Sequence, residues 1–317
     1  MSSQREATKP GGPVSGVSVV IPAYNYAAFL PRAIDSAWQQ THRPVEIIVV
    51  DDGSTDNTRE IVASYGGRVR YIHQANAGLS AARNTGIQHA HHPFIALLDA
   101  DDEWLPERLQ TGMEIFARQP SDFGVVACLS HRVGGDSQPL AANPAVNEIT
   151  GEITAADILL MTRFSPSTAI VRAEVFQQCG GFDTTLRSSE DRDMWIRAAT
   201  RWRVWLQPER LALIRKHGGN MSSHADRMKL NMGRVIRKCW RERVVPRGRL
   251  GYWLQVLAIY HYQTALIYQG LGRRGAALRD LSISLGCWPL PIPARRLNAS
   301  VSLLRLRALA RLCRTGS

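Results

Sequence analysis

The residues best suited to chemistry are the three carboxylates of Asp99-Ala100-Asp101-Asp102, which follow a short apolar run. Carboxylates this close together repel one another unless a cation compensates their charge. Mg²⁺ and Mn²⁺ prefer oxygen ligands, and either ion could bridge one of these carboxylates to a diphosphate. A solvated turn, with Asp102 or Glu103 in the first turn of the next helix, would explain the same residues without a metal. The run therefore indicates a candidate cation site and leaves a structural alternative open.

Two further groups could transfer a proton or bind a metal. The pair Glu190-Asp191 begins a predicted helix, where the helix dipole favours carboxylates whatever their function. An Asp with an ordinary pKa of about 4 is ionised at neutral pH and can accept a hydroxyl proton within hydrogen-bond reach. His217 precedes a Gly-Gly-Asn segment, but a single His is more often a structural hydrogen-bonding group than a ligand. Neither group identifies a site by itself.

Arg83 lies in a predicted helix and could point toward an anion, because a guanidinium group binds phosphate or carboxylate through two parallel hydrogen bonds. A surface ion pair explains Arg83 equally well. His89, His91 and His92 end the same helix just before a proline. We interpret these three histidines as structural rather than metal-binding.

The elements that must position these groups alternate along the chain. Short apolar runs predict strands and the segments between them predict helices. The predicted strands are 17–22, 45–50, 68–73 and 93–98, and the predicted helices are 29–40, 55–65, 80–89 and 106–118. Apolar runs separated by helices are typical of parallel strands covered on both faces. The fold class is therefore α/β, with an open sheet.

Polar residues follow three of these strands, at 23–25, 51–54 and 99–102. Ligands of parallel sheets bind beyond the carboxyl ends of the strands, so we expect the three segments to meet at one crevice. Neither a GxGxxG nor a GxxxxGK[ST] motif occurs in the sequence. A nucleotide in this crevice must therefore be held in another way.

The remaining elements are less regular. We predict a strand at 123–130, a loop at 132–147, a helix at 153–162, an extended segment at 168–171, a helix at 190–201, strands at 204–207 and 211–215, and helices beyond 225 that are interrupted near 270–275 and at 288–293. Residues 1–16, rich in Gly, Pro and Ser, are predicted to be a disordered lead-in.

Composition excludes several classes of protein. The 317 residues are 44% hydrophobic and 21% charged, with five cysteines and no CxxC pair, which argues against a disulfide framework or a zinc site and favours a reducing cytosol. No apolar run reaches the 18 residues of a membrane span. We therefore expect a cytoplasmic protein, with any membrane contact peripheral, on the cytoplasmic face of the inner membrane. The overall charge is +12, but residues 218–317 alone carry 18 bases and 3 acids.

Seven segments in order resemble the inverting family 2 glycosyltransferases of GT-A fold: VSVVIPAYN, VVDDGSTD, NAGLSAARNTG, LLDADDEW, GGFD, EDRDMWIR and RKHGGNMS. The resemblance covers about residues 15–222. It implies a Rossmann-like, mixed and mostly parallel sheet with helices on both faces. It also implies a GT-A domain at 17–222, followed by a basic helical C-terminal extension at 223–317.

The resemblance implies roles for individual residues. Asp52 would hydrogen-bond the base, Asp101 would be the principal metal ligand together with His217, and Asp191 would be the catalytic base. The metal would be Mn²⁺ or Mg²⁺. The expected contacts to the nucleotide sugar are Pro22, Ala23, Tyr24, Asp52, Arg83, Asp99, Ala100 and Asp101, and the candidate contacts to the acceptor or sugar are Glu190 and Ser167.

The implied reaction is a single displacement that moves a sugar from a nucleotide diphosphate, most simply a UDP-sugar, to an acceptor hydroxyl. An α-linked donor would give a β-linked product. A divalent cation would neutralise the leaving diphosphate while a carboxylate takes the hydroxyl proton. The expected acceptor is a saccharide or lipid-linked saccharide, in the biosynthesis of a cell-surface polysaccharide or glycoconjugate.

Other interpretations stay open at this point. One is a sugar transferase that acts on a polyprenyl phosphate, whose acceptor is already an anion and has less need of a catalytic base. Another is a catalytically silent relative, but all the carboxylates expected from the motifs are present in this sequence. The extension could cap the catalytic part or dock on an anionic membrane. A nucleic-acid-binding protein, using clustered Arg with Trp240, Trp253, Tyr260 and Tyr262, is an interpretation of another class that no known motif supports. The arginines of the predicted basic helix are Arg295, Arg296, Arg305, Arg307, Arg311 and Arg314.

Overall fold

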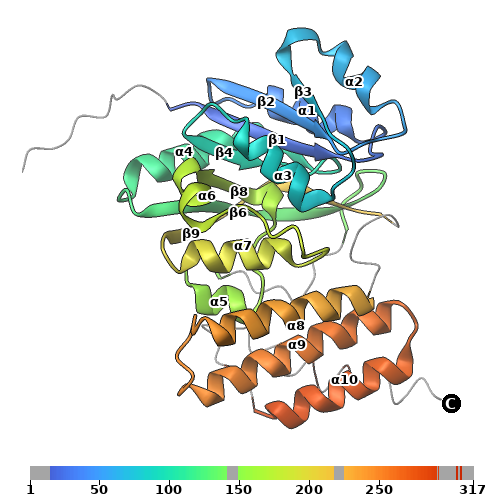
Figure 1. Cartoon of the computed structure of the whole chain (residues 1–317), viewed down its shortest axis with the longest axis vertical. Coiled ribbons are helices and arrows are strands. Elements are labelled where there is room, and N and C mark those ends of the chain that lie inside the picture. The colour runs from blue at the N-terminus through green and yellow to red at the C-terminus, as the bar shows by residue number, and fades with distance from the viewer. Residues whose placement is uncertain are drawn as a thin grey trace, which may run out of the picture.

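The computed structural model of the chain describes residues 15–140, 149–217 and 225–290, together with 292, 305 and 308. Figure 1 shows a sheet in the upper half of the molecule and a layer of three helices, α8 to α10, below it. The predicted lead-in lies outside the described residues except for its last two. The arginines of the predicted basic helix also lie outside them, except Arg305.

The elements have the following bounds. The strands are β1 Val17–Ala23, β2 Val45–Asp51, β3 Arg70–His73, β4 Phe94–Leu97, β5 Glu103–Trp104, β6 Phe123–Gly134, β7 Gly151–Ile153, β8 Ala169–Arg172 and β9 Arg203–Lys216. The α-helices are α1 Leu30–Trp38, α2 Thr58–Ser64, α3 Leu79–Gln88, α4 Arg108–Arg118, α5 Ala155–Leu160, α6 Ala173–Cys179, α7 Glu190–Ala199, α8 Ala225–Arg241, α9 Leu250–Gly270 and α10 Arg274–Cys287.

The strands form one mixed sheet in the order β3-β2-β1-β4-β8-β6-β9-β5, with β7 paired to β9. β1, β2, β3 and β4 run parallel to one another, and β6 runs parallel to β9. β8 is antiparallel to its two neighbours. The predicted class, a mixed and mostly parallel sheet, is confirmed.

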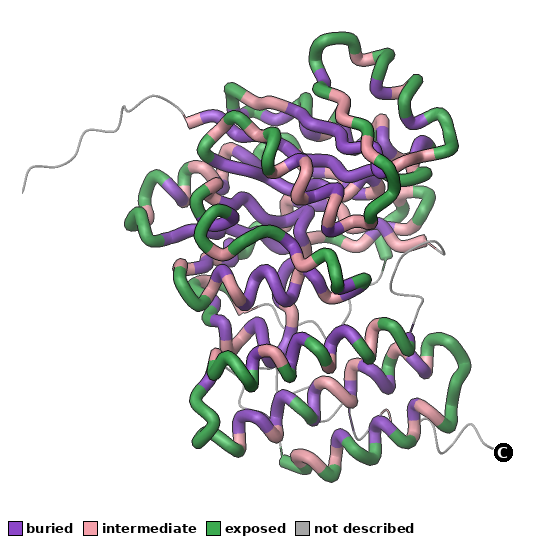
Figure 2. Tube along the Cα trace, in the orientation of Figure 1, coloured by how far each residue is buried: buried purple, intermediate pink, exposed green. Residues whose placement is uncertain are grey.

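Helices cover both faces because alternate side chains of a strand point to opposite sides of the sheet. Val19 and Ile21 of β1 pack in one core with Ile34 of α1. Val20 packs in a second core, against which Ile87 of α3 is placed. Both cores contribute to the buried residues in the middle of Figure 2. The unbroken apolar runs of the central strands follow from this burial on both faces.

Several predictions differ from the structure, and β5, β7 and the break between α8 and α9 were not predicted. The two strands predicted at 204–207 and 211–215 are a single strand, β9, whose pairing with β6 shifts register after Cys128 and after Leu129. The segment 208–210, which begins with Pro208, lies at this irregularity. A β-bulge can accommodate a proline, which has no backbone N–H to donate to the neighbouring strand. β6 extends to Gly134, into the predicted loop, and the helix α6 was not predicted.

The three helices of the extension are joined by a buried charge. Asp280 of α10 is fully buried, and its carboxylate accepts hydrogen bonds from Lys229 Nζ of α8 at 2.7 and 2.8 Å. His261 Nδ1 of α9 lies 2.6 Å from the same carboxylate. The predicted interruptions at 270–275 and 288–293 agree with the ends of α9 and α10. Within the described part of the chain, no helix combines the length and apolar character needed to cross a bilayer.

The extension shares a core with the sheet. Tyr252, Val256 and Ile259 of α9 belong to the same cluster of buried side chains as Val125 of β6 and Trp195 of α7. Tyr252 also donates a hydrogen bond to the carbonyl oxygen of Ala156 of α5 at 2.6 Å. In the described part of the chain the helices α8 to α10 are therefore packed against the part that contains the sheet.

Candidate active site

A cavity of about 480 Å³ lies at the carboxyl ends of β1, β2 and β4. The three polar segments predicted to converge do line one cavity, because these strands are parallel and neighbouring. Asp191, at the start of α7, lines the same cavity. The predicted site residues that line it are Pro22, Ala23, Tyr24, Asp52, Arg83, Asp99, Ala100, Asp101, Glu190 and Asp191.

Asp102 supports the turn that carries the other two carboxylates. It is 4% exposed, and it accepts hydrogen bonds from Ser167 Oγ at 2.6 Å and from the backbone N–H of Arg215 at 2.9 Å. Burial, and then the charges of Asp101 and Asp99, raise its pKa well above the usual range. The structural alternative fails in one respect, because Glu103 belongs to β5 and the next helix begins only at Arg108.

Asp101 and His217 lie side by side. The Nε2 atom of His217 is 3.0 Å from Oδ2 of Asp101, and the imidazole ring stacks on Phe29 with ring centroids 5.0 Å apart. Burial and the neighbouring Asp99 raise the pKa of Asp101, so this carboxylate lies where a positive charge would be favourable. The described residues contain no group of three or more His, Cys, Asp or Glu side chains placed to hold a metal.

One carboxylate and one imidazole nevertheless suit a divalent ion that also binds its substrate. Mg²⁺ in nucleotide sites is commonly held by one or two carboxylates together with phosphate oxygens, and imidazole is a ligand of transition metals. Asp101 and His217 therefore fit an ion whose other ligands come from a diphosphate.

Arg83 joins the two acidic motifs. Its guanidinium is 1% exposed and donates from Nη2 to Asp99 Oδ1 at 2.7 Å and from Nη1 to Glu190 Oε1 at 2.8 Å. Burial opposes ionisation, but the two carboxylates outweigh it and raise the pKa of Arg83. Arg83 lines the cavity, as predicted for a residue near the nucleotide, while both of its terminal nitrogens bind carboxylates.

Asp191 has the electrostatics of a base. Burial, and then the charge of Glu190, raise its pKa to about 6, so a small change of environment moves it between its two protonation states. Its Oδ1 accepts the backbone N–H of Arg192 at 2.7 Å.

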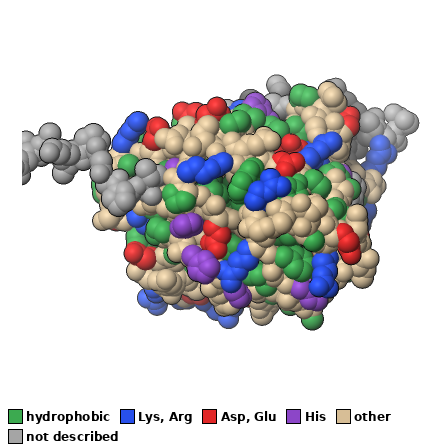
Figure 3. Space-filling model, turned by 90° about the horizontal axis from the view of Figure 1, so that it is seen from above, with side chains coloured by type: hydrophobic (Ala, Val, Ile, Leu, Met, Phe, Trp, Pro, Cys, Tyr) green, Lys and Arg blue, Asp and Glu red, His purple; other side chains and the backbone are tan. Residues whose placement is uncertain are grey.

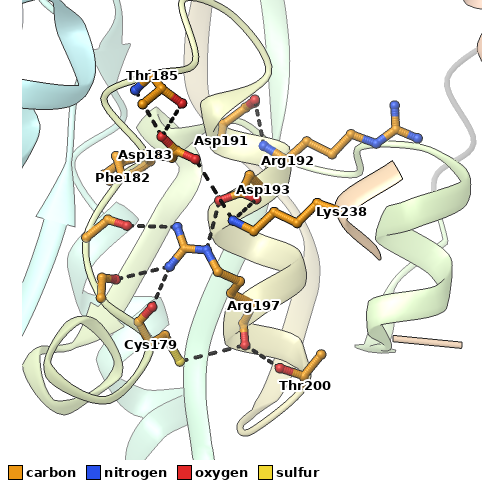
Figure 4. A network of polar contacts seen from close by, with 12 residues as sticks. Cys179, Phe182, Asp183, Thr185, Asp191, Arg192, Asp193, Arg197, Thr200 and Lys238 are labelled. Carbon is orange, nitrogen blue, oxygen red and sulfur yellow. Dashed lines mark hydrogen bonds and ion pairs between the residues drawn. The ribbon is translucent and has the colours of Figure 1, made fainter. Parts of the chain in front are cut away.

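The helix that carries Asp191 is fixed by the network drawn in Figure 4. Arg197 donates to Asp193 Oδ2 at 2.8 Å and to the carbonyl oxygen of Gly181 at 2.7 Å. Lys238 of α8 donates to the other oxygen of Asp193 at 2.8 Å. α7 is therefore tied both to the Gly-Gly loop before it and to the extension.

Asp52 shapes the loop that precedes α3. Its carboxylate accepts the backbone N–H groups of Ala77 and Gly78 at 2.9 and 2.8 Å and the side-chain amide of Gln74 at 2.7 Å. Gly78 has a φ of 93°, a conformation that favours glycine. The loop is thus fastened against the cavity wall.

Ser167, predicted to contact the acceptor or sugar, is fully buried. Its Oγ donates to Asp102 and accepts the backbone N–H of Asp99 at 3.1 Å. The neighbouring Ser165 and Pro166 line the cavity instead. We therefore assign Ser167 to the support of the acidic turn.

Several residues of the cavity were missed in the sequence, among them Tyr26, Asn76, Arg215 and Met228. Arg215 is 1% exposed, forms an ion pair with Glu103, and donates from Nε to the carbonyl oxygen of Asp101 at 3.0 Å. The only signal was its place in the RKH segment beside His217. Met228 of α8 lines the cavity, and nothing in its local sequence indicates this.

Residues 18–180 match the family model described as glycosyl transferase family 2. Among curated relatives, an uncharacterized glycosyltransferase of Nostoc sp. is 33% identical over 230 residues, covering 64% of this chain and 66% of that protein. One from Rickettsia prowazekii is 29% identical over 211 residues, covering 66% of each chain. The chain thus spans just under two thirds of the length of these two relatives.

Solved structures share the fold. Staphylococcus aureus TarS 1–349 superimposes with a TM-score of 0.64 at 18% identity, covering 95% of this chain and 92% of TarS 1–349. The mannosyltransferase PcManGT of Pyrobaculum calidifontis, in complex with GDP-Man and Mn²⁺, gives a TM-score of 0.61 at 18% identity, covering 95% and 88%. At 18% identity these two likenesses show the fold. Together with the family match, these findings show that the chain is a glycosyltransferase of GT-A fold that belongs to glycosyl transferase family 2.

Proposed function

We propose that the chain transfers a sugar from a nucleotide diphosphate to an acceptor hydroxyl by a single, inverting displacement that depends on a divalent metal. One observation supports this most directly. Asp101, the candidate for the metal and diphosphate, and Asp191, the candidate base, line the same cavity. Separate cavities would have ruled out their acting on one sugar.

On the donor side, Pro22, Ala23, Tyr24 and Asp52 would contact the nucleoside and Asp99 and Asp101 the ribose and diphosphate. Asp101 and His217 would hold Mn²⁺ or Mg²⁺, which when bound neutralises negative charge on the leaving diphosphate. Solved relatives of the fold bind UDP-GlcNAc, UDP and GDP-Man, the last with Mn²⁺. We take a UDP-sugar as the first donor to test.

On the acceptor side, Asp191 would take the proton of the attacking hydroxyl. Its raised pKa makes it a stronger base than an ordinary Asp, while it remains ionised at neutral pH. A polyprenyl phosphate acceptor is already an anion and needs no such base, which favours a hydroxyl acceptor. We place the reaction in the synthesis of a cell-surface polysaccharide or glycoconjugate.

Nucleotide binding and catalysis can be tested separately. Thermal shift with UDP, GDP, dTDP and CDP, each with Mn²⁺, Mg²⁺ or EDTA, should show one nucleotide that stabilises the protein only with metal. Asp101→Ala should lose the metal-dependent part of the shift. Asp191→Asn should keep the shift and abolish transfer. Loss of nucleotide binding in Asp191→Asn, or transfer at the normal rate, would contradict the assignment.

Peripheral membrane contact through the extension remains a proposal, supported by the net charge of residues 218–317. Arg305 takes no part in it, because it is fully buried and donates to the carbonyl oxygen of Trp288 at 2.8 Å. The nucleic-acid alternative loses two of its stacking residues, since Trp253 and Tyr262 are only 3% and 2% exposed.

A further inference from the structure

We propose that the acceptor is an anionic chain, bearing phosphate or carboxylate groups, which binds along a row of arginines leading out of the active site. The inference rests on the proposed function and adds the class of acceptor to it. The row consists of Arg187, before α7, and Arg227, Arg234, Arg237 and Arg241 of α8. All five side chains belong to exposed residues.

The row begins beside the active site. A second cavity, of about 140 Å³, is lined by Arg187 and Arg227 and shares Gly78, Leu79 and Glu190 with the large cavity. Neither guanidinium group has a hydrogen-bond or ion-pair partner among the described residues. The one carboxylate of this cavity, Glu190, is bound to Arg83 at 2.8 Å. Two uncompensated cations therefore face a small cavity next to the base.

The N-terminus of α3 adds to the same site. Leu79 and Ser80, its first two residues, line the second cavity, and N–H groups of a first helical turn have no partner within the helix. Ser80 is 5% exposed and its Oγ has no hydrogen-bond partner. The guanidinium of Arg187 lies over Gly78, with Nη1 2.8 Å from where a Cβ would be. Donors from three segments thus surround a space that would suit one anionic group.

The row continues along α8 because Arg227, Arg234 and Arg241 recur every seven residues. Two helical turns take about seven residues and rise about 10.5 Å, so these three side chains lie on one face. A third cavity, of about 300 Å³, is lined by Arg234, Arg237, Lys238 and Arg241 together with Asp183 and Asp193.

The acids of the third cavity are already neutralised. Asp193 binds both Arg197 and Lys238 at 2.8 Å, as Figure 4 shows. Asp183 lies 4.0 Å from Lys238 and accepts hydrogen bonds from Thr185. Arg237 and Arg241 have no hydrogen-bond or ion-pair partner in the described part of the chain. The cavity is therefore net positive.

The loop at 183–187 connects the two smaller cavities, because Leu186 lines both of them. The loop is held to α8 at Ser188, whose Oγ accepts from Asn231 Nδ2 at 3.1 Å. On the face seen from above in Figure 3, side chains of both signs are interspersed. Four arginines on the path that leaves the active site, Arg187, Arg227, Arg237 and Arg241, thus have no acidic partner among the described residues.

A neutral glycan has no charged group that these arginines could bind. Guanidinium groups bind phosphate and carboxylate through paired hydrogen bonds, and several exposed cations in line attract a polyanion together, although salt screens each one. An acceptor with repeated charges and a free hydroxyl at its end satisfies both the row and Asp191.

The test measures binding of three polymers to the full chain, namely inorganic polyphosphate, polygalacturonate and neutral dextran. Arg187→Gln/Arg227→Gln and Arg234→Gln/Arg241→Gln should each weaken binding of the anionic polymers by about tenfold or more. The control is Arg118→Gln/Arg274→Gln, which removes the same charge from exposed positions on α4 and α10 and should bind as the parent does. Preference for polyphosphate or polygalacturonate identifies phosphate or carboxylate as the recognised group.

Three results would overturn the inference: dextran binding as tightly as the polyanions, equal losses in the control, or tighter binding of single-stranded DNA than of either polyanion. Hydrolysis of the nucleotide sugar without acceptor separates this inference from the proposed function. It should be unchanged in the control Arg118→Gln/Arg274→Gln. Absence of nucleotide-sugar binding and hydrolysis in the parent would refute the function, whereas hydrolysis without polyanion preference would refute only the acceptor class.

Discussion

Asp101 and Asp191, like Asp102, have raised pKa values, and the surroundings of Asp101 and Asp191 suggest a different use for each. Asp101 lies beside another carboxylate and an imidazole, so a bound cation would restore its ionised form. Asp191 has no cationic hydrogen-bond donor among its described contacts, and burial dominates its shift. The first arrangement suits a metal ligand and the second a group that exchanges protons.

The raised pKa of Asp191 predicts the pH dependence of transfer. The carboxylate accepts a proton only when ionised, so kcat/KM should rise with pH through about 6 and level off above it. Glu190→Gln removes the neighbouring negative charge and releases Arg83, and both changes favour ionised Asp191. The acidic limb should therefore move to lower pH in this variant. A limb at the same pH in Glu190→Gln would argue that another group titrates.

The raised pKa of Asp191 also predicts that its ionised carboxylate lowers the free energy of unfolding. Between the ordinary value of 3.8 and about 6, the folded state holds a proton on Asp191 that the unfolded state has lost, so stability falls as pH rises through this window. Asp191→Asn should raise the free energy of unfolding at pH 7 by about 1–2 kcal/mol, less than the full linkage value because the side chain lines an open cavity. Denaturant titrations at about pH 4 should show little difference. A destabilised variant at pH 7 would contradict the assignment.

At the residue scale, strand-end positions could be predicted from sequence and supporting contacts could not. Asp52, Asp99 and Asp101 follow apolar runs, and parallel pairing alone brings such positions together. The roles of Ser167 and Arg215 depend on Asp102, which lies 65 and 113 residues away from them. No local pattern encodes a contact of that separation.

At the scale of elements, β9 aligns the acidic turn with the rest of the sheet. Near its end, Arg215 binds the backbone of the turn, the carboxylate of Glu103 and the carbonyl oxygen of Gly134 at 2.9 Å. Sequence reasoning divided β9 in two because residues 208–210 are polar, and polarity at a register shift resembles polarity at a turn. Only the pairing with β6 distinguishes the two cases.

This anchoring predicts that a change on β9 disturbs the candidate metal site. Arg215→Gln leaves Glu103 without its ion pair and the turn without its backbone contacts, and should lower the free energy of unfolding by about 3 kcal/mol. The metal-dependent thermal shift by nucleotide should fall more than the shift seen with EDTA. Arg210→Gln, a change on the same strand away from the turn, is the matched control. Equal losses of both shifts would indicate a general effect on folding instead.

At the scale of the whole molecule, the extension takes part in the catalytic fold. Met228 lines the active-site cavity, Lys238 fixes α7, and α9 shares its core with the sheet. Composition separated the extension from the rest by its charge. The interruptions at 270–275 and 288–293 were predicted, but the break between α8 and α9 was not. The apolar contacts that join the two parts were not predictable, because α9 is apolar around most of its circumference and does not reveal which face meets the sheet.

A shared core predicts that the sheet and the extension unfold together, and the buried Asp280 provides the means to test it. Lys229 and His261 hold this carboxylate ionised and lower its pKa despite burial, so its contribution is present at neutral pH and is lost as pH falls below the ordinary value. Asp280→Ala leaves the ammonium of Lys229 without its partner and should cost about 3–5 kcal/mol at pH 7. Hydrogen exchange should show α9 and β6 losing protection at the same, lower denaturant concentration, because one cooperative unit unfolds as a whole. If α9 alone lost protection while nucleotide binding persisted, the extension would be an independent domain, and its side chains in the active site would be dispensable for donor binding.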